Sequence, residues 1–575
     1  MAERDVLTLR SQQNPLRANT LRRRAAGWWP LLVAIVPLVF LSIFFVLPVG
    51  GMMARGLHPD GHWALGDALG VFGRSRQQRV VLFTLGIAAV GTIATTLLGL
   101  PVAYALYRLR IPGAGILRAI VVTPFVLPTV VVGVAFRTLL TSSGPLGFLG
   151  LDGGWIAIAL ALVFFNLSVV VRTVGSAWAG LDARPQDAAA ALGASPAQVF
   201  RTVTLPALAP TILSAVTIVF LFCATAFGVV LTLGGLKYST IETEIYLQTT
   251  DILDLRTAAV LSIAQFLVVI LLLVVVERAR AGVTPTPQRA GVSARRRPAR
   301  HDLPVLSATA AVVAFLILPI ASLVVRSLQA NGGWSLENYQ RLSGVGDGNA
   351  LLVPVIDAIT SSWRIAIDAT LISVSLGLAV AVVISYRPSG QAGGHAGGKR
   401  TRRIAVLDAL FMLPLGISAV TVGFGFLVTL DKPPLDLRNS PYLIPIAQAL
   451  VALPLVVRTV APALSAIDDR QRQAAASLGA GRWGVIATVD LPVIWRPLLA
   501  ATGFAFAVSL GEFGATSFLA RPENPTLPVV IYQLIGHPGG QNFGMALAAS
   551  VLLAAMTAAV MAGVEGLRVG SVGRF

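Results

Sequence analysis

The sequence carries one polar pattern twice, as Asp187-Ala188-Ala189, Gly193 and Val203-Thr204-Leu205-Pro206, and as Gln473-Ala474-Ala475, Gly479 and Val489-Asp490-Leu491-Pro492. The spacing within the two copies is identical, and the copies lie 286 residues apart (479 − 193 = 286). Each copy is flanked by long apolar runs. This arrangement predicts a membrane protein that uses the repeated element outside the bilayer.

The composition is that of an integral membrane protein. Of the 575 residues, 55% are hydrophobic and 12% are charged, and the mean hydropathy is +0.78. A soluble domain would carry about 25% charged residues. Runs such as 30–48 contain no charge at all, and about 20 apolar residues in a helix span the hydrocarbon core. Cys223, the single cysteine, lies in an apolar run and is interpreted as a small filler.

The net charge of +18 does not indicate a nucleic-acid partner, because the basic residues are clustered beside apolar runs. Such clusters orient membrane helices, with the positive side in the cytoplasm. We therefore expect both termini to be cytoplasmic in a multi-pass protein of the bacterial cell membrane. The clusters are the arginines before Trp28, those from Arg278 to Arg300, and Arg387, Lys399, Arg400, Arg402 and Arg403.

The two halves of the chain match beyond the opening pattern. At the same offset, and with no gap between Leu127 and Tyr246, further short matches align. A duplicated domain with an even number of spans gives two copies of the same orientation, and a path between them follows. The matches are Leu127-Pro128 with Leu413-Pro414, Val171-Arg172-Thr173-Val174 with Val457-Arg458-Thr459-Val460, Phe227-Gly228 with Phe513-Gly514, and Thr240 and Tyr246 with Thr526 and Tyr532.

The predicted fold is an all-α integral membrane protein of about twelve transmembrane helices in two homologous six-helix halves. The halves are 29–276, with a polar loop at 180–206, and 304–566, with a polar loop at 466–492. A basic segment (1–28), a basic linker (277–303) and a short tail (567–575) are expected in the cytoplasm. The spans are expected near 29–50, 80–107, 116–140, 155–178, 207–230, 256–276, 304–326, 363–386, 405–429, 442–465, 494–518 and 542–565.

Within each polar loop we expect short alanine-rich helices (187–200 and 472–486), a break at the glycine and a turn into the next span at Leu-Pro. This pattern resembles the Glu-Ala-Ala…Gly…Leu-Pro loop of ABC importer permeases. The resemblance implies a coupling helix that docks on an ATPase subunit. It would place Asp187, Ala188, Ala189, Gly193, Leu205 and Pro206 at one ATPase contact, and Gln473, Ala474, Ala475, Gly479, Leu491 and Pro492 at the other. Asp187 and Gln473 replace the family's glutamate, so the two contacts are expected to be unequal.

The resemblance implies three partners besides the lipid bilayer: two copies of a cytoplasmic ABC ATPase subunit and an extracytoplasmic substrate-binding protein. The chain itself is not expected to be an enzyme or to hold a cofactor. Gly393 to Lys399 has the spacing of a phosphate loop, but no Ser or Thr follows and no strand precedes it. His58 and His62 have a metal-like separation in a short external loop, where surface histidines are the better interpretation.

A charged residue within a span is a functional candidate. Glu512 lies toward the outer end of the predicted span 494–518. Two interpretations are open: it lines the path or gate, or it is a structural carboxylate paired with another helix. Ala226 occupies the matching position of the first half. Besides Glu512, the candidate path residues are Ser509, Phe227 and Phe513.

From about residue 80 to 565 the chain resembles the fused permeases of the ferric-iron and thiamine importer group. Thr240-Ile241-Glu242 and the Ser509–Gly514 stretch are among the residues that carry this resemblance. It implies thiamine as the first candidate cargo, then ferric iron, then organophosphonates or polyamines. The alternative is a secondary transporter driven by an ion gradient, which would need coupling carboxylates near the midplane of the membrane.

Overall fold

The computed structural model describes residues 29–58, 62–235, 237–281, 295–385, 411, 417–431 and 435–569. The predicted segment 1–28, most of the linker 277–303, the basic cluster at 387–403 with its Gly-Lys motif, and the last six residues lie outside this part. The described chain is helical, except for a two-stranded hairpin of β1 (Gln329–Ala330) and β2 (Gly333–Trp334).

Ten described helices are long and apolar enough to cross a membrane, and the number is eleven if a bent pair of helices is counted as one span. One predicted span remains, 405–429. The structure describes mainly its short helix α20 (Ala419–Thr429). The fold class is confirmed. The long elements are α3–α4 (Trp29–Leu41 and Leu47–Leu57, joined by a π-turn), α6 (Ser75–Arg108), α9 (Trp155–Ala179), α12 (Leu205–Ala224), α15 (Leu255–Ala281), α16 (Leu303–Ser327), α18 (Val355–Ser385), α21 (Leu443–Ser465), α24 (Leu491–Leu510) and α27 (Gly540–Val569).

The predicted straight span 116–140 is wrong, because the chain bends by 106° between α7 (Ala114–Val126) and α8 (Thr129–Leu140). A residue that precedes proline is disfavoured in the helical conformation. Leu127, before Pro128, is accordingly extended, with ψ 139°. The bend turns α8 across the end of the bundle.

The predicted spans 207–230 and 494–518 are too long, because α12 ends at Ala224 and α24 ends at Leu510. At both breaks a glycine lets the backbone approach a neighbouring segment closely. A Cβ on Gly228 would lie 2.4 Å from Thr129 Oγ1, and a Cβ on Gly511 would lie 3.0 Å from Pro128. Short helices then fill one end of the molecule. They are α13 (Gly228–Gly234), α14 (Ile241–Thr250), α25 (Thr516–Leu519) and α26 (Leu527–Gly536).

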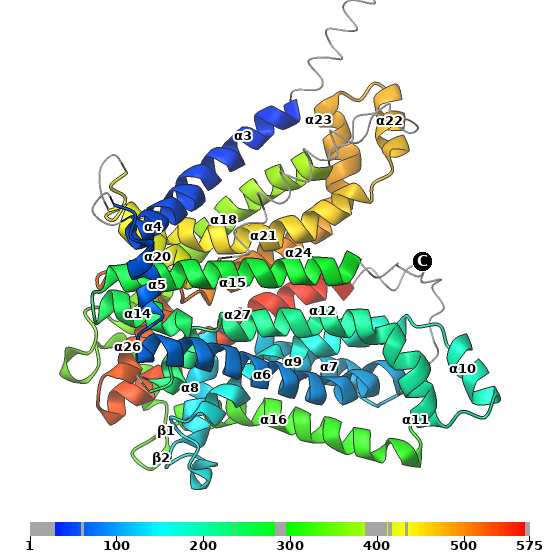
Figure 1. The fold of residues 1–575 in the computed structure, drawn as a ribbon, viewed down its shortest axis with the longest axis horizontal. Coiled ribbons are helices and arrows are strands. Elements are labelled where there is room, and N and C mark those ends of the chain that lie inside the picture. The colour runs from blue at the N-terminus through cyan, green and yellow to red at the C-terminus, as the bar shows by residue number, and fades with distance from the viewer. Residues whose placement is uncertain are drawn as a thin grey trace, which may run out of the picture.

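The first helix of each half packs on the other half. α3 lies against α18, and α16 lies against α6, α7 and α8 (Figure 1). Within each half, small residues bring the long helices close together, as is usual in membrane proteins. A Cβ on Gly99 would lie 2.7 Å from Val170, and one on Gly377 would lie 2.6 Å from Val456. The two valines are 286 residues apart, so both halves repeat this contact.

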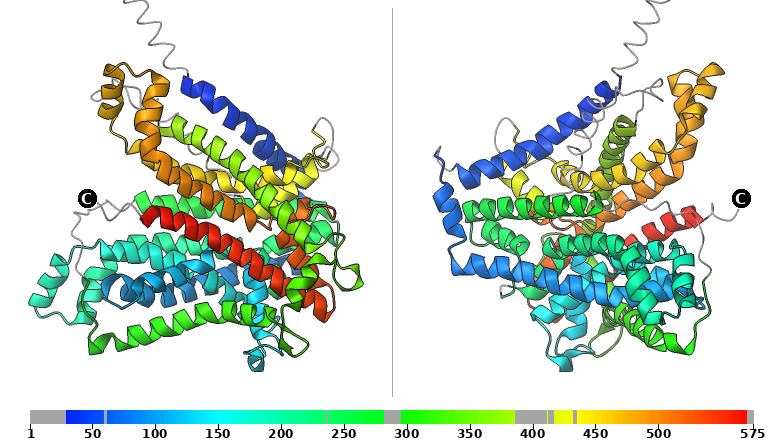
Figure 2. Two further views of the ribbon diagram at one scale, coloured as in Figure 1. Left: turned by 180° about the vertical axis from the view of Figure 1, so that it is seen from behind. Right: turned by 45° about the vertical axis from the view of Figure 1, so that its right-hand side comes forward.

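Two arms diverge from a shared end (Figures 1 and 2). One arm holds α6, α9, α12 and α16, and the other holds α18, α21, α24 and α3. We call the end with α14 and α26 the closed end, and the end where the polar loops lie the loop end. The buried cluster at the closed end joins residues of both halves, such as Val130 and Val420. Toward the loop end each arm has its own core.

The predicted gap-free match from Leu127 to Tyr246 is wrong at one place. Gly133 of α8 lies against Thr232, and Gly423 of α20 lies against Phe518, whose position corresponds to Thr232. These two glycines are 290 residues apart, so the second half has four extra residues after Leu413-Pro414. Ser418, the residue before α20, is the last of these extra residues, and Pro128 holds the corresponding place before α8.

The remaining short elements connect the spans. They are α5 (Leu65–Val71), α10 (Arg184–Ala191), α11 (Pro196–Val199), α17 (Glu337–Gln340), α22 (Asp469–Ser477), α23 (Arg482–Val485), π-turns at Ser42–Val46, Phe200–Thr204 and Ile486–Asp490, and 3₁₀ turns at Gly147–Leu149, Arg300–Asp302, Arg341–Ser343 and Asp347–Asn349.

Candidate functional site

The two polar loops have the same geometry, and their glycines explain it. α10 and α22 both end at a glycine with positive φ, +87° at Gly193 and +90° at Gly479. The N–H of Gly193 donates to Ala190 O and that of Ala194 donates to Ala189 O. The second loop repeats these bonds at Gly479 and Ala480. This is a Schellman cap, in which glycine takes the left-handed position at little cost. The predicted break at the glycine is present in both loops.

The predicted turn at Leu-Pro lies close to the point where the chain changes direction. A π-helical turn at Phe200–Thr204 joins α11 to α12 in one continuous helical segment, and Ile486–Asp490 does the same between α23 and α24. α11 and α23 run at an angle to α12 and α24 (Figures 1 and 2). Leu205-Pro206 and Leu491-Pro492 begin α12 and α24, and proline is tolerated in the first turn of a helix. The second helix of each loop is thus joined to a membrane span with no break in the helical backbone.

The tips of both loops expose leucine. Leu192 is 89% exposed and Leu478 is 90% exposed, and they precede the two glycines. Asp187, Ala188, Gln473 and Ala474 are also exposed, whereas Ala189 and Ala475 are half-buried. The second loop adds an exposed Trp483. Each loop therefore presents an apolar tip with a short polar or charged side.

The loops differ in how they are anchored. In the second, Arg472 donates to Asp490 at 2.8 Å and to Asp469 at 3.0 Å. In the first, the equivalent Gln186 accepts a bond from Arg108 at 3.2 Å. Arg472 was not predicted from the sequence. A signal for it was present, because the second loop has Asp490 where the first has Thr204, and this aspartate is the partner of Arg472. The expected inequality of the loops therefore extends to their internal bonds.

Phe227 and Phe513 meet between the halves at the closed end. Their rings stack with centroids 5.3 Å apart. Tyr246 packs edge-on against Phe227 and against Phe518, at 5.5 and 5.4 Å, and Tyr532 lies 5.5 Å from Phe513. We call these five residues the aromatic plug. It joins side chains from both halves where the paired short helices meet.

Two comparisons place these features among known proteins. The family model described as "Binding-protein-dependent transport system inner membrane component" matches the chain twice, over residues 95–285 and 393–567. The chain belongs to this permease family. It is the membrane component of an ABC importer.

The permease is similar along most of its length to proteins named as thiamine transporters. It is 26% identical to the thiamine transport system permease protein ThiP of Brucella abortus, over 83% of this chain and 86% of the relative. The Escherichia coli protein of the same name is also 26% identical, over 83% and 87%. The molybdenum transport system permease protein ModB of Escherichia coli is 37% identical, over 24% of this chain and 66% of that protein.

Glu512 of the permease lies beyond α24, not inside a span. Its carboxylate accepts hydrogen bonds from the backbone N–H of Ala515 at 2.8 Å and of Thr516 at 3.0 Å. Thr516 begins the next helix, α25, so the carboxylate joins the end of α24 to α25, in line with the structural interpretation. Ser509 is buried, and its hydroxyl has no partner among the described residues.

Two buried acids of α14 were missed as candidates by sequence reasoning. Glu244 forms a bidentate ion pair with Arg76 at 2.7 and 3.0 Å. Glu242 accepts a bond from Ser418 of the other half at 2.8 Å. Both acids lie in a predicted loop between spans. The sequence criterion used for Glu512, a charge inside an apolar run, therefore did not identify them. Among the described residues, no three His, Cys, Asp or Glu side chains are grouped as a metal site would require.

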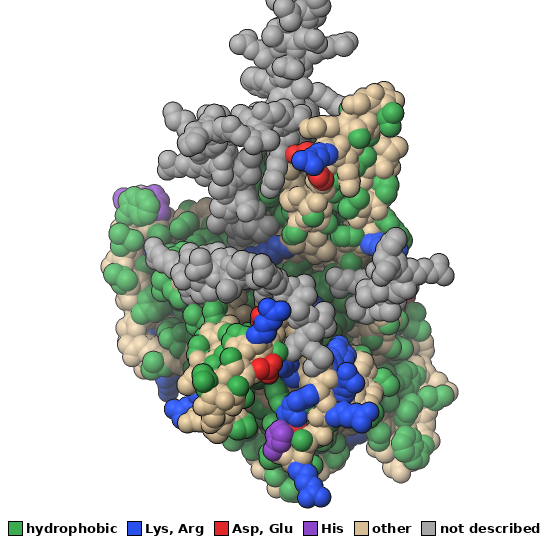
Figure 3. Space-filling model, turned by 90° about the vertical axis from the view of Figure 1, so that its right-hand side faces the viewer, with side chains coloured by type: hydrophobic (Ala, Val, Ile, Leu, Met, Phe, Trp, Pro, Cys, Tyr) green, Lys and Arg blue, Asp and Glu red, His purple; other side chains and the backbone are tan. Residues whose placement is uncertain are grey.

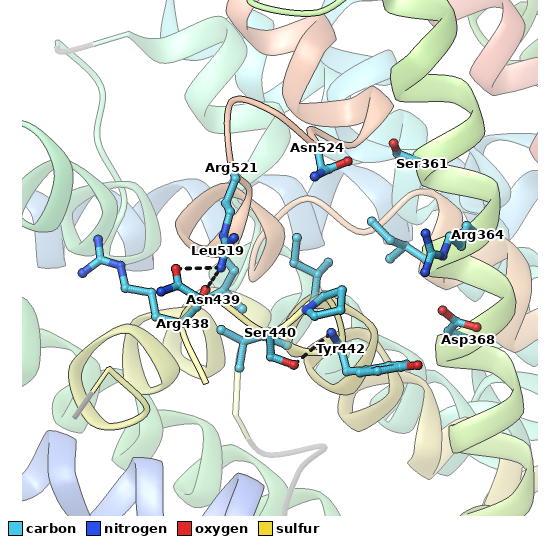
Figure 4. Close-up of a pocket in the computed structure, with 14 residues that line it drawn as sticks. Ser361, Arg364, Asp368, Arg438, Asn439, Ser440, Tyr442, Leu519, Arg521 and Asn524 are labelled. Atoms are coloured by element: carbon cyan, nitrogen blue, oxygen red, sulfur yellow. Dashed lines mark hydrogen bonds between the residues drawn. The ribbon is translucent and has the colours of Figure 1, made fainter. Parts of the chain in front are cut away.

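A cavity of about 280 Å³ opens at the closed end, between the start of α18 and the loops before α21 and α26 (Figure 4). Arg364, Arg438 and Arg521 contribute to its lining with Asp368. Arg521 donates to Asn439 at 3.1 Å and to the carbonyl of Arg438. All of its lining residues belong to the second half, so this cavity does not lie between the halves.

Among the charged side chains at the loop end of the permease, basic ones are more numerous than acidic ones (Figure 3). Arg295, Arg297 and Arg300, in the described part of the linker, are exposed there. Arg296 connects this segment to α6 and α16, because it donates to Asp302 at 2.7 and 2.6 Å and to Tyr104 at 2.5 Å. The described part of the linker is therefore held against the bundle.

Proposed function

We propose that this permease imports thiamine or a closely related organic cation, and that two separate ATPase subunits drive it through the two polar loops. The names of the full-length relatives support thiamine over ferric iron. A binding protein on the closed side would deliver the cargo. The basic character of the loop end supports a cytoplasmic location for that end.

The geometry of the loops supports the coupling role. Each loop offers an exposed leucine, and an unbroken helical backbone leads from the loop into α12 or α24. Movement of a docked ATPase would therefore be carried into the span through this bent helical segment. Because the two arms share a core only at the closed end, they are free to approach each other at the loop end.

The arrangement of the arms corresponds to an inward-facing state. The loop ends are apart, and the aromatic plug shuts the opposite end (Figure 2). Closure of the ATPase pair would bring the loops together and separate the plug. A shift between two such states gives alternating access.

The cargo is tested by ATP hydrolysis in lipid nanodiscs. The permease is assembled with its ATPase and its binding protein, and the binding protein is loaded with thiamine, loaded with ferric iron, or left empty. We expect thiamine loading to stimulate hydrolysis several-fold over the empty protein. Stimulation by ferric iron instead would replace thiamine as the cargo. An ATPase that does not bind the permease would favour the ion-gradient alternative.

The coupling role is tested at the two glycines. We expect Gly193→Val with Gly479→Val to uncouple transport from ATP hydrolysis, because a left-handed backbone costs a residue with a Cβ about 1–2 kcal/mol. No atom lies within 4 Å of either added Cβ, so the effect comes from the backbone alone. Gly481→Ala, two residues on in the same loop, has equal space and is the control. Normal transport per ATP in the double variant would contradict the coupling role.

A further inference from the structure

Glu242 connects the two halves beside the aromatic plug. Its side chain is fully buried on α14, and its Oε2 accepts a hydrogen bond from the hydroxyl of Ser418, which precedes α20. Tyr246 of the plug lies one helical turn further along α14. Positions four residues apart share a face of a helix. The carboxyl therefore faces the junction that must open if the closed end opens.

The carboxyl has no charged partner among the described residues. Glu242 Oε1 lacks a hydrogen bond of good geometry, and the side chain within its reach is that of Gln265, whose amide can donate but is neutral. Leaving a buried acceptor unsatisfied costs about 1–3 kcal/mol, and more for a charged group. A buried carboxylate without a charged partner favours a ligand that brings positive charge.

The fold does not require a carboxyl at this junction. α26 and α8 form the equivalent contact of the other pair of helices. There the position equivalent to Glu242 is Pro528, and the residue that precedes α8, as Ser418 precedes α20, is Pro128. The duplicated domain thus builds the same contact without a polar side chain, so the cost of burying Glu242 is not needed for packing.

The surroundings suit an aromatic cation. Tyr246 of the plug lies one turn from Glu242 on α14, and its ring packs against Phe227 and Phe518. A cation over an aromatic ring gains about 0.5–2 kcal/mol, with the larger value where water is excluded. Thiamine carries a permanently charged thiazolium ring, which can both stack on such faces and pair with a carboxylate.

We propose that Glu242 is a cargo-recognition residue, which pairs with the cationic ring as the cargo passes the opened plug. This inference rests on the proposed function. Glu242 Oε1 is the acceptor that the cation would satisfy. The Ser418 bond holds the carboxyl in position while the closed end is shut.

The test measures thiamine transported per ATP hydrolysed, in proteoliposomes that contain permease, ATPase and thiamine-loaded binding protein. Glu242→Gln keeps the volume of the side chain and an oxygen for Ser418 but removes the charge. We expect this ratio to fall at least about tenfold, equivalent to about 1.4 kcal/mol. Hydrolysis stimulated by the loaded binding protein is expected to remain. Glu242→Asp, which keeps the charge, should recover part of the ratio.

The control is Glu337→Gln, because Glu337 lies on α17 and pairs locally with Arg341. It removes one carboxylate far from the plug and should leave the ratio unchanged. A normal ratio in Glu242→Gln would overturn the inference while the thiamine assignment stands. Loss of hydrolysis and assembly in both Glu242 variants would show a structural role and would also overturn it. Absence of thiamine uptake by the unaltered complex would instead refute the cargo assignment.

Discussion

The double variant Leu192→Asp with Leu478→Asp is expected to lose its ATPase subunits. Both leucines are about nine-tenths exposed at the tips of the polar loops, where no described residue covers them. Burying one leucine in a partner contributes about 2 kcal/mol, which corresponds to roughly a thirtyfold change in affinity. An aspartate there would also bring an unpaired charge into the contact. Co-purification of the ATPase with the permease, at increasing salt, measures the loss.

The two single variants separate the loops. The second loop has an additional exposed Trp483 and is braced by Arg472, so Leu478→Asp should retain more ATPase than Leu192→Asp. Leu69→Asp is the control, because Leu69 of α5 is 71% exposed at the closed end. Loss of ATPase in this control, or full retention in the double variant, would contradict docking through the loop tips.

The repeat explains why the sequence predicted so much of the fold. The same spacing of residues recurs at an offset of 286 and reveals a duplication, and charge-free runs reveal spans. Both signals can be found in short stretches of sequence. The loop glycines were predictable for the same reason: the cap at Gly193 or Gly479 depends only on the five residues before it.

The breaks in the spans were not predictable from composition. Leu127-Pro128 lies in an apolar run whose composition predicts one helix. The proline permits a break there, but the direction of the turn depends on packing against Gly511, far along the chain. The four extra residues before α20 were hidden because the match resumes at the same offset further on. Glu242 was missed because its importance comes from Ser418, 176 residues away.

We expect Phe227→Ala with Phe513→Ala to open the closed end. Removing a buried phenylalanine costs about 3–5 kcal/mol, and this stacked pair contributes to the closed state only, since its rings belong to opposite halves. A bias of about 3 kcal/mol against the closed state raises the open population by roughly two orders of magnitude. In proteoliposomes without ATP, passive leak of thiamine should therefore rise well above that of the unaltered permease.

A general loss of stability must be distinguished from an opened gate. Phe136→Ala is the matched control, because Phe136 packs on Phe164 at 5.4 Å inside the first arm. It should lower thermal stability without leak. Cys223 is fully buried in the same core, so its thiol should stay unreactive to maleimide in the plug variant if the arm is intact. Leak at the unaltered level, with Cys223 still protected, would show that the aromatic plug does not close the path. In that case the shared core at the closed end would have to hold the halves together without it.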